Sequence, residues 1–317
     1  MTPARVAVTL ANSKGQPAVA VGLNNLGTQS MKAKLSLKLP GGWMAERNQV
    51  TFGILAQGET AIQFLALKLM PGATNVSTLS VKGTMGDQSL TTERKLKVYR
   101  APHRTVPIVL DGELTEEEYG RAPLIELNDA TQLWSKDRTG WVASNGCARV
   151  RAVWDEKAIY LGVDVRDDYV QNTAPLTALF NGDCLEVYFD TATDEHMFEN
   201  SLHDHQGKFL LAPAQPPEMP AARVYCRSVP PGGTIRRLAG DRAQIVSKRT
   251  PTGYTLECKI PVSDVNLSSG LIWGFDVSLI DRDGVPPNQK CYQYYWSGTG
   301  DEPYNRPHGF GFLWLVE

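Results

Sequence analysis

Residues 181–190, NGDCLEVYFD, hold three carboxylates, and carboxylates can accept hydroxyl groups, coordinate metal ions or transfer protons. Apolar and polar residues alternate from position 185 to position 190, which predicts a half-buried β-strand with Glu186 in its middle. Asp183 and Glu186 are three positions apart, so a strand points them to opposite faces, where they make a poor acid/base pair. We therefore interpret Glu186 as a binding residue that points into a concave site.

The sequence holds none of the common catalytic motifs: no GxSxG nucleophile turn, no HExxH metal motif and no phosphate-binding loop. Its five cysteines are widely spaced and include no CxxC pair, which argues against a zinc ribbon. Cys184 and Cys258 lie in strand patterns, where we expect them to be small buried hydrophobic residues. We predict that the chain is not an enzyme.

The composition of the 317 residues narrows the remaining classes. The 32 Lys and Arg nearly balance the 34 Asp and Glu, so no basic surplus favours nucleic acid. No apolar run approaches the ~18 residues that cross a bilayer. The 28 Gly and 20 Pro suit short strands joined by many turns, and the length allows two domains. We predict an all-β chain that does not bind nucleic acid and does not span a membrane.

The first hundred residues read as short strands separated by Gly, Asn and Pro clusters. The predicted strands are 5–10, 18–23, 32–38, 49–55, 60–69, 77–84 and 90–98. This spacing predicts an immunoglobulin-like sandwich without the Cys…Trp…Cys signature of antibody domains. The segment resembles the small Ig-like modules found beside glycosidase and sugar-binding domains. We interpret residues 1–103 as a spacer domain and residues 99–104 as the linker that follows its last strand.

Beyond residue 107, several motifs follow one another in a recognisable order. They are DGEL at 111–114, ARVRAVWDEKAIYLGVDVRDD at 148–168, NGDCLEVYFD at 181–190, GYTLECKIPVSDV at 253–265 and GFGFLWLVE at 309–317. In this combination they resemble the family 9 carbohydrate-binding module, a DOMON-like β-sandwich of the jelly-roll type. The resemblance assigns residues 104–317 to one such domain. A short capped helix is expected at 115–119, where Tyr119 replaces the usual Trp.

The resemblance implies a site in which two aromatic side chains clamp a sugar. Aromatic rings suit the C–H face of a pyranose, and polar groups at the edges take its hydroxyls. Carried over by position, Phe180 and Tyr304 form the clamp, while Glu186 and Asp301 accept hydroxyl groups. Both clamp positions normally hold Trp, so each stacking surface is smaller in this chain.

The other ligand positions of the family depart more strongly. The family's Gln in the strand after "GF" aligns with Ser278, and its Arg and Asn between positions 194 and 213 have no convincing counterpart. That segment instead holds His203, Asp204, His205, Gln206 and Lys208. Trp134 and Trp141 flank the polar loop WSKDRTGW, and we name them as replacement platforms for the sugar.

Carboxylates also gather at two predicted strand ends, at Asp167 and Asp168 and at Asp183. Calcium prefers several carboxylate and carbonyl oxygens, and the resemblance implies structural calcium. We therefore name these three aspartates as a candidate calcium site. The turn at 281–284, DRDG, superficially matches a calcium loop, but the EF-hand pattern fails beyond it.

The function that the resemblance implies is non-catalytic binding of an oligo- or polysaccharide. We expect the chain to be the accessory part of a larger secreted, polysaccharide-acting protein, extracellular or periplasmic, in which a glycoside hydrolase domain is the expected partner. We expect its signal peptide to have been removed from this sequence.

Two alternatives stay open. The chain is a structural scaffold without a ligand, or it is a DOMON-like haem- or metal-binding module that uses Met197 with His203 or His205. The two histidines are two positions apart on a predicted strand and would face the same side. A Soret band in the purified protein would favour haem, and a ligand screen without binding would favour the scaffold.

Overall fold

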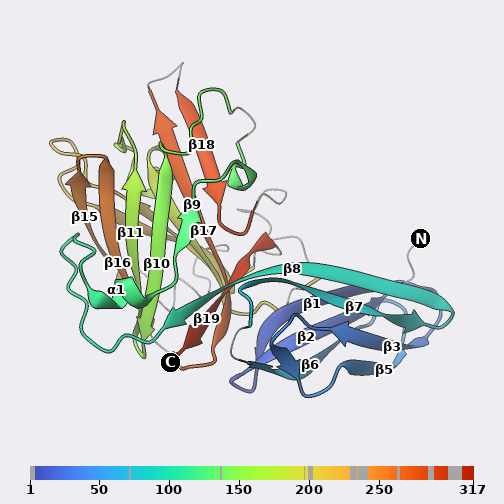
Figure 1. Cartoon of the computed structure of the whole chain (residues 1–317). Coiled ribbons are helices and arrows are strands. Elements are labelled where there is room, and N and C mark those ends of the chain that lie inside the picture. The colour runs from blue at the N-terminus through green and yellow to red at the C-terminus, as the bar shows by residue number, and fades with distance from the viewer. Residues whose placement is uncertain are drawn as a thin grey trace. The chain divides into compact units, whose positions relative to one another are not determined.

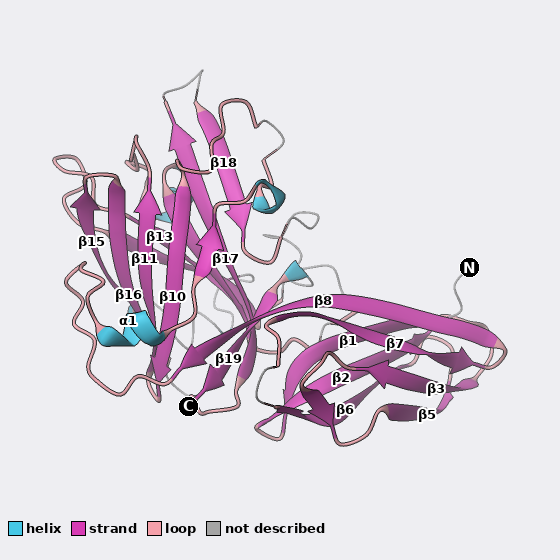
Figure 2. Cartoon of the chain, in the orientation of Figure 1, coloured by secondary structure: helices cyan, strands magenta, loops and turns pink. Residues whose placement is uncertain are grey.

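The structure, a computed structural model, consists almost entirely of β-strands joined by turns, which confirms the all-β prediction (Figure 2). It describes residues 4–70, 73–135, 138–195, 197–198, 203–228, 234, 242–262, 265–284, 289–298 and 309–317. The chain divides into two compact units. The first unit comprises Met1–Val98, Ala192–Asn200 and Gly270–Trp273, and the second comprises Tyr99–Thr191, Ser201–Ser269 and Gly274–Glu317.

The first unit contains two sets of paired strands. One set is ordered β1 (Ala4–Ser13), β2 (Gln16–Asn25), β6 (Thr60–Leu69) and β4 (Trp43–Ala45). The other is ordered β8 (Gln88–Pro102), β7 (Val76–Met85), β3 (Met31–Lys38) and β5 (Gln49–Leu55) (Figure 1). All seven predicted strands are present, and only the three-residue β4 was missed because it is too short to show alternation. The immunoglobulin-like assignment of this unit stays a prediction.

The second unit contains two larger sheets (Figure 1). One sheet is ordered β15 (Gln244–Thr250), β16 (Gly253–Pro261), β11 (Ala158–Arg166), β10 (Cys147–Asp155) and β9 (Ile125–Leu127). The other is ordered β14 (Arg223–Ser228), β13 (Gln206–Ala212), β12 (Cys184–Asp190), β17 (Ile272–Asp283) and β19 (Gly311–Val316). β18 (Lys290–Tyr295) also pairs with β17, and the end of β8 lies beside β19.

The segment predicted as a linker at 99–104 is instead mostly strand, because β8 continues to Pro102. Tyr99 and Ala101 are both buried, and the Tyr99 hydroxyl donates to the Pro123 carbonyl over 2.7 Å. Pro and basic residues suggested a linker, but Tyr99 and Ala101 are two positions apart and both buried, which holds the segment in the sheet. The division into units falls at Val98, and the domain boundary at 103 stays a prediction.

The only α-helix among the named elements, α1 (Glu117–Arg121), begins two residues later than predicted. Its N-cap residue, Glu116, makes no side-chain capping hydrogen bond, so the predicted cap is wrong. Tyr119 is buried against β11, where a methyl group on Gly162 would lie 3.0 Å from its ring. The helix is therefore held by packing of the Tyr119 ring on the backbone at Gly162, which has no side chain.

β12 has two chemically different faces. Leu185, Val187 and Phe189 face the apolar core, where the Phe189 ring lies 5.6 Å from the Phe275 ring of β17. Glu186 and Tyr188 point to the opposite face. They are also buried, so the prediction of a half-buried strand is wrong. Other side chains must therefore cover the polar face, and they form the candidate site.

Replacement of Phe275 by alanine tests the assignment of the core face. Phe275 is wholly buried, so we expect Phe275→Ala to lower the free energy of unfolding by about 3–5 kcal/mol through lost contacts and a residual cavity. Urea unfolding followed by tryptophan fluorescence measures the change. The control Val109→Ala, at a side chain that is 64% exposed, should change it by less than about 0.5 kcal/mol. Equal losses in the two variants would contradict the assignment.

Candidate functional site: a polar face and an acidic group on opposite sides of one sheet

Glu186 is the centre of a buried hydrogen-bond network on the polar face of β12. Its carboxylate accepts hydrogen bonds from the Lys208 ammonium and from the Tyr188 hydroxyl. Gln293 of β18 donates to it over 3.3 Å, and the same amide donates to the Ser278 hydroxyl over 3.1 Å. Glu186 is 1% exposed, and its charge is therefore stabilised by a cation and two neutral donors.

The strand register brings these side chains together. Glu186 pairs with Ser278 of β17, and Tyr188 pairs with Lys208 of β13. Directly paired residues project to the same face of a sheet, so four strands contribute to one surface. We call this surface, which carries Glu186, Tyr188, Lys208, Ser278 and Gln293, the outer face.

Aromatic side chains border the network on the side of β18. Tyr188, Tyr295 and Phe310 form a buried cluster, and the half-buried Trp134 packs against it. The Tyr188 and Phe310 rings lie 5.3 Å apart, and the Lys208 ammonium lies 5.1 Å from the centre of the Tyr188 ring. Trp134 is thus the predicted platform that the structure brings to the outer face.

Phe180 reaches the outer face from the other side. It lies near the end of the 3₁₀ helix η2 (Leu176–Asn181) and is half-buried against Cys184 and Leu210. Leu210 is the cross-strand partner of Glu186. Tyr225 of β14 packs on the same cluster. The polar network therefore lies between two aromatic groups, one with Phe180 and Tyr225 and one with Trp134.

Trp141 is not part of this surface. Trp141 donates its indole N–H to the Tyr294 hydroxyl, and Tyr294 faces the opposite side of β18 from Gln293. Asp301 and Tyr304 lie outside the described residues, so their predicted roles stay predictions.

Four participants in the network had no predicted role in sugar binding: Tyr188, Lys208, Gln293 and Tyr295. Lys208 was visible in the segment that lacked the expected Arg and Asn. Gln293 and Tyr295 alternate along β18, and this period-two pattern in KCYQYY was the available signal. Pairing with β17 was needed to place them beside Glu186.

A second feature is a group of carboxylates, two on the core side of β17 and one directly after β11. Asp167, Asp281 and Asp283 each offer an oxygen atom within 4.8 Å of the others, and we call them the acidic group. Asp281 is 2% exposed, and neither of its carboxylate oxygens has a hydrogen-bond partner within the described residues. Two buried oxygens without a donor are costly unless a cation or a proton occupies the space between them.

The acidic group differs from the predicted calcium site in two members. Asp167 belongs to it, whereas Asp183 is held by backbone N–H groups of Gln171 and, over 2.8 Å, of Arg282. Asp168 is exposed and is bound by Asn145. The turn at 281–284, which was set aside because it fails the EF-hand pattern, supplies the other two members.

Burial and mutual repulsion raise the pKa of these carboxyl groups. Loss of hydration is the main cause for each, and the neighbouring carboxylates add to it. The pKa of Asp167 rises to about 6, that of Asp281 to about 8 and that of Asp183 to about 9. At pH 7 the Asp281 and Asp183 carboxyls are therefore mainly protonated, whereas Asp167 is mainly ionised.

The residues fit a hard cation such as calcium. All the donors are oxygens, and the two unpartnered oxygens of Asp281 face the group. Gly146 has a positive φ of 59° and approaches Asp281 so closely that any side chain there would collide with the carboxylate. Asp167, Asp281 and Asp283 would hold the ion, and the ion would neutralise their repulsion.

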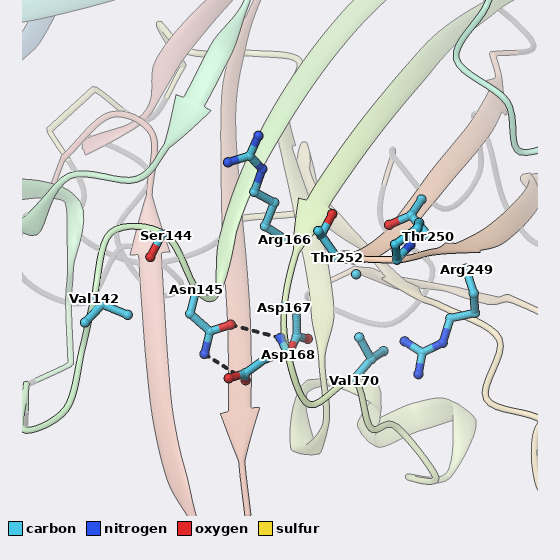
Figure 3. A pocket seen from close by; sticks show the side chains of 12 residues that line it. Val142, Ser144, Asn145, Arg166, Asp167, Asp168, Val170, Arg249, Thr250 and Thr252 are labelled. Atoms are coloured by element: carbon cyan, nitrogen blue, oxygen red, sulfur yellow. Dashed lines mark hydrogen bonds between the residues drawn. The ribbon is translucent and has the colours of Figure 1, made fainter.

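A pocket of about 830 Å³ reaches the acidic group from outside (Figure 3). Asp167 lines it together with Asp168, Asn145 and Arg249. Figure 3 shows the Asn145 amide joined to Asp168 by two hydrogen bonds of 2.9 and 3.0 Å. Asp167 belongs both to the pocket wall and to the acidic group, so the pocket borders the group at this residue.

The residues named as ligands for the alternative haem or metal site lie in different units. Met197 belongs to the first unit, where it packs against Ala11 and Ala20. His203 and His205 belong to the second unit, in the turn before β13, so the prediction that they share a strand is wrong. Both groups of metal-ligating side chains found among the described residues consist of carboxylates alone.

Comparison with known proteins is consistent with this geometry. A family described as "Carbohydrate family 9 binding domain-like" matches residues 110–317. The chain belongs to this family. The family 9 match includes β12, the outer face and the acidic group, and it leaves the first unit unassigned.

Two solved structures and one sequence relative are similar to the family 9 region. A family 9 module from Caldicellulosiruptor kristjanssonii in complex with cellotriose is 15% identical, covers 69% of this chain and 94% of its own, and gives a TM-score of 0.51. The same kind of module from that organism, in complex with glucose, is 17% identical over 69% of this chain and 95% of its own, with a TM-score of 0.49. The first similarity supports the β-sandwich fold of the family.

The relative is the endo-1,4-beta-xylanase C of Paenibacillus barcinonensis, 22% identical over 174 residues. The match covers 55% of this chain and 14% of the xylanase. This chain therefore corresponds to a small part of that enzyme's length.

Calcium should stabilise the protein, and the effect should grow with pH. A carboxyl whose pKa is raised by folding stabilises the metal-free protein below pH ~4, and this contribution is lost as pH rises through about 8 for Asp281. We therefore expect EDTA-treated protein to lose thermal stability between pH 5 and 8. Calcium at about 100 times its Kd should restore ~2.7 kcal/mol, which differential scanning fluorimetry detects as a higher Tm.

Two variants make this test specific. Asp281→Asn should abolish the calcium-dependent rise in Tm and should stabilise the metal-free protein at pH 8, because it removes a buried charge. Asp168→Asn, at the exposed neighbour outside the acidic group, should leave the rise intact. Identical melting in calcium and in EDTA at pH 8 would refute the calcium assignment.

Proposed function

We propose that the chain binds carbohydrate on the outer face without altering it. The observation that carries the proposal is the polar network around Glu186, which lies between aromatic groups from opposite sides of the sheet. Family membership supports the same function. The similar modules from C. kristjanssonii, which are in complex with cellotriose and with glucose, make neutral gluco-oligosaccharides the first ligands to test.

The network has capacity left for sugar hydroxyls. A carboxylate offers about four acceptor sites, and Glu186 uses three of them for Lys208, Tyr188 and Gln293. An ammonium offers three donors, and Lys208 gives one to Glu186 and a long one of 3.4 Å to the Tyr188 hydroxyl. One acceptor and one donor therefore remain to hold adjacent hydroxyl groups of a pyranose.

Stacking would supply the rest of the binding energy. Trp134 and Phe180 are half-buried, so each keeps an exposed part of its ring. A pyranose that lies on such a ring removes apolar surface from water on both partners. We keep Tyr304 and Asp301 as further ligands on the strength of the family pattern, with Trp141 as a residue that supports the fold through Tyr294.

The arrangement of the described carboxylates supports binding without catalysis. Glu186 lies on the outer face, whereas Asp183, Asp281 and Asp283 lie on the core side of the same sheet. A glycosidase needs two carboxyl groups on either side of one glycosidic bond. Glu186 is instead paired with Lys208, which suits binding.

We further propose that the acidic group binds structural calcium and that the chain works within a larger secreted protein. The buried, unpartnered oxygens of Asp281 support the first statement. The similarity to a small part of a xylanase supports a parent protein with a glycoside hydrolase domain and an extracellular or periplasmic location. No helix in the described part of the chain is long and apolar enough to cross a membrane.

Calorimetric titration with cello- and xylo-oligosaccharides tests sugar binding. We expect Glu186→Gln to weaken binding by about 10- to 100-fold, since a hydrogen bond to a charged group is worth about 1.5–3 kcal/mol. Trp134→Ala and Tyr304→Ala should weaken it through lost stacking. Leu176→Ala, at an exposed residue of the same short helix as Phe180, is the control and should bind normally.

Because Glu186 is buried, the fold of the Glu186→Gln variant must be checked. Glu186→Gln leaves Lys208 without its charged partner, so its circular dichroism and Tm should be compared with those of Trp134→Ala, which is less disruptive. Unchanged affinity in folded Glu186→Gln, Trp134→Ala and Tyr304→Ala would exclude the outer face as the sugar site. A screen in which no oligosaccharide binds would favour the scaffold alternative.

A further inference from the structure

The edge strand β14 adds two side chains to the outer face that the proposed function does not use. Tyr225 pairs with Leu210 and Arg227 pairs with Lys208, so both project to the same side as Glu186. Arg227 is exposed, and within the described part of the chain its side chain makes no hydrogen bond and no ion pair. Its guanidinium is therefore available to a ligand.

Two more arginines on this face are bound only to neutral acceptors. Arg223 of β14 donates to the backbone carbonyls of Ala174 and Asn172, both over 2.5 Å. Arg282 of β17 donates to the Phe180 carbonyl over 3.1 Å. Carbonyl oxygens orient these guanidinium groups without neutralising their charge, so each adds positive potential to the surface near the Phe180 and Tyr225 rings.

The acidic residues of the outer face do not balance these charges. Glu186 is paired with Lys208, and Asp190 accepts a hydrogen bond from Gln206 over 2.9 Å. Asp276 accepts from backbone N–H groups and from a serine hydroxyl. All three are buried, whereas Arg227 is exposed. A ligand that approaches this face therefore meets the cation first, although the whole chain has a net charge of −2.

The positions of Tyr225 and Arg227 suit one kind of sugar. Tyr225 is half-buried beside Phe180 and exposes part of its ring. Arg227 is two residues farther along β14, which is ~7 Å in an extended strand. A hexuronic acid carries its carboxylate at the edge of the pyranose ring. If that ring lies on Tyr225, its carboxylate comes within reach of the planar guanidinium, which binds carboxylates through two hydrogen bonds.

We propose that the outer face selects an acidic oligosaccharide, with Tyr225 as the stacking surface for a uronic acid residue and Arg227 as the partner of its carboxylate. Arg223 and Arg282, which are bound to neutral acceptors, supply further positive potential. This inference rests on the proposed function, since it names the class of sugar that the same face prefers. The uronic acid is either a side group on a neutral backbone or a unit of a polyuronate.

Calorimetric titration of the full chain with three ligands of equal length tests this selection. The ligands are neutral xylotetraose, xylotriose bearing one glucuronic acid, and tetragalacturonate. We expect at least one acidic ligand to bind about tenfold or more tightly than xylotetraose, as one charge-assisted pair provides. The preference should shrink at high sodium chloride because salt screens exposed charges. The acidic ligand that binds better identifies the source of the uronic acid.

Substitutions of arginine separate a specific pair from general attraction. Arg227→Gln should remove most of the preference for the acidic ligand and leave the affinity for xylotetraose unchanged, and Arg227→Lys should keep part of it. Arg166→Gln, at an exposed arginine of β11 on the other sheet, removes the same charge and should have no effect. Tyr225→Ala should weaken the acidic ligand through lost stacking.

The outcomes distinguish this inference from the proposed function. Equal affinity for neutral and acidic ligands, or a preference that survives Arg227→Gln, overturns the selection of acidic sugars and leaves carbohydrate binding in place. Failure of all three ligands to bind, together with failure of the cello-oligosaccharides, overturns the proposed function and this inference with it.

Discussion

The antiparallel pairing of β12 with β17 is the constraint on which the rest of the second unit depends. Because side chains alternate along a strand, one register fixes two surfaces at once. It stacks Phe189 on Phe275 in the core, and it places Glu186 beside Ser278 on the outer face. A slip of one residue would exchange these faces and bury Glu186 among aromatic rings, which its charge forbids.

The same strand pair handles buried charge in two different ways. On the outer face, the Glu186 carboxylate has an ammonium and neutral donors, so it stays charged within a satisfied network. On the core side, the Asp281 carboxylate has carboxylates as neighbours and no donor in the described chain. The first arrangement suits recognition of hydroxyl groups, and the second suits an ion. Ser278 and Asp281 lie three positions apart on β17, so both sites depend on the same stretch of backbone.

Much of this organisation could be read from the sequence, because it rests on period-two alternation and on turn residues. The strands, the position of Glu186 and the separation of Asp183 from it follow from local pattern. The partners of Glu186 do not, since Lys208 and Gln293 come from strands whose register is a long-range property. The segment after Val98 misled for the opposite reason: its composition suggested a loop, but burial of Tyr99 overrode that local preference.

The predicted calcium ligands also show that the sequence does not report long-range contacts. Spacing along the chain singled out Asp167, Asp168 and Asp183, yet neighbours in sequence point in different directions at a strand end. Asp281 and Asp283 lie on β17 and Asp167 follows β11 of the other sheet, so the packing of the two sheets brings these carboxylates together. Proximity in space, which the sequence does not report, decides which oxygens can share an ion.

The buried, unpartnered oxygens of Asp281 also link calcium binding to protonation of this carboxyl. The pKa of Asp281 is about 8, so this carboxyl is mainly protonated near neutral pH, and calcium bound there would displace its proton. Binding of calcium would therefore release a proton, and its measured heat would include the ionisation of the buffer that takes up this proton. Within the folded domain, the pH and the calcium concentration would thus act on the same carboxylate oxygens.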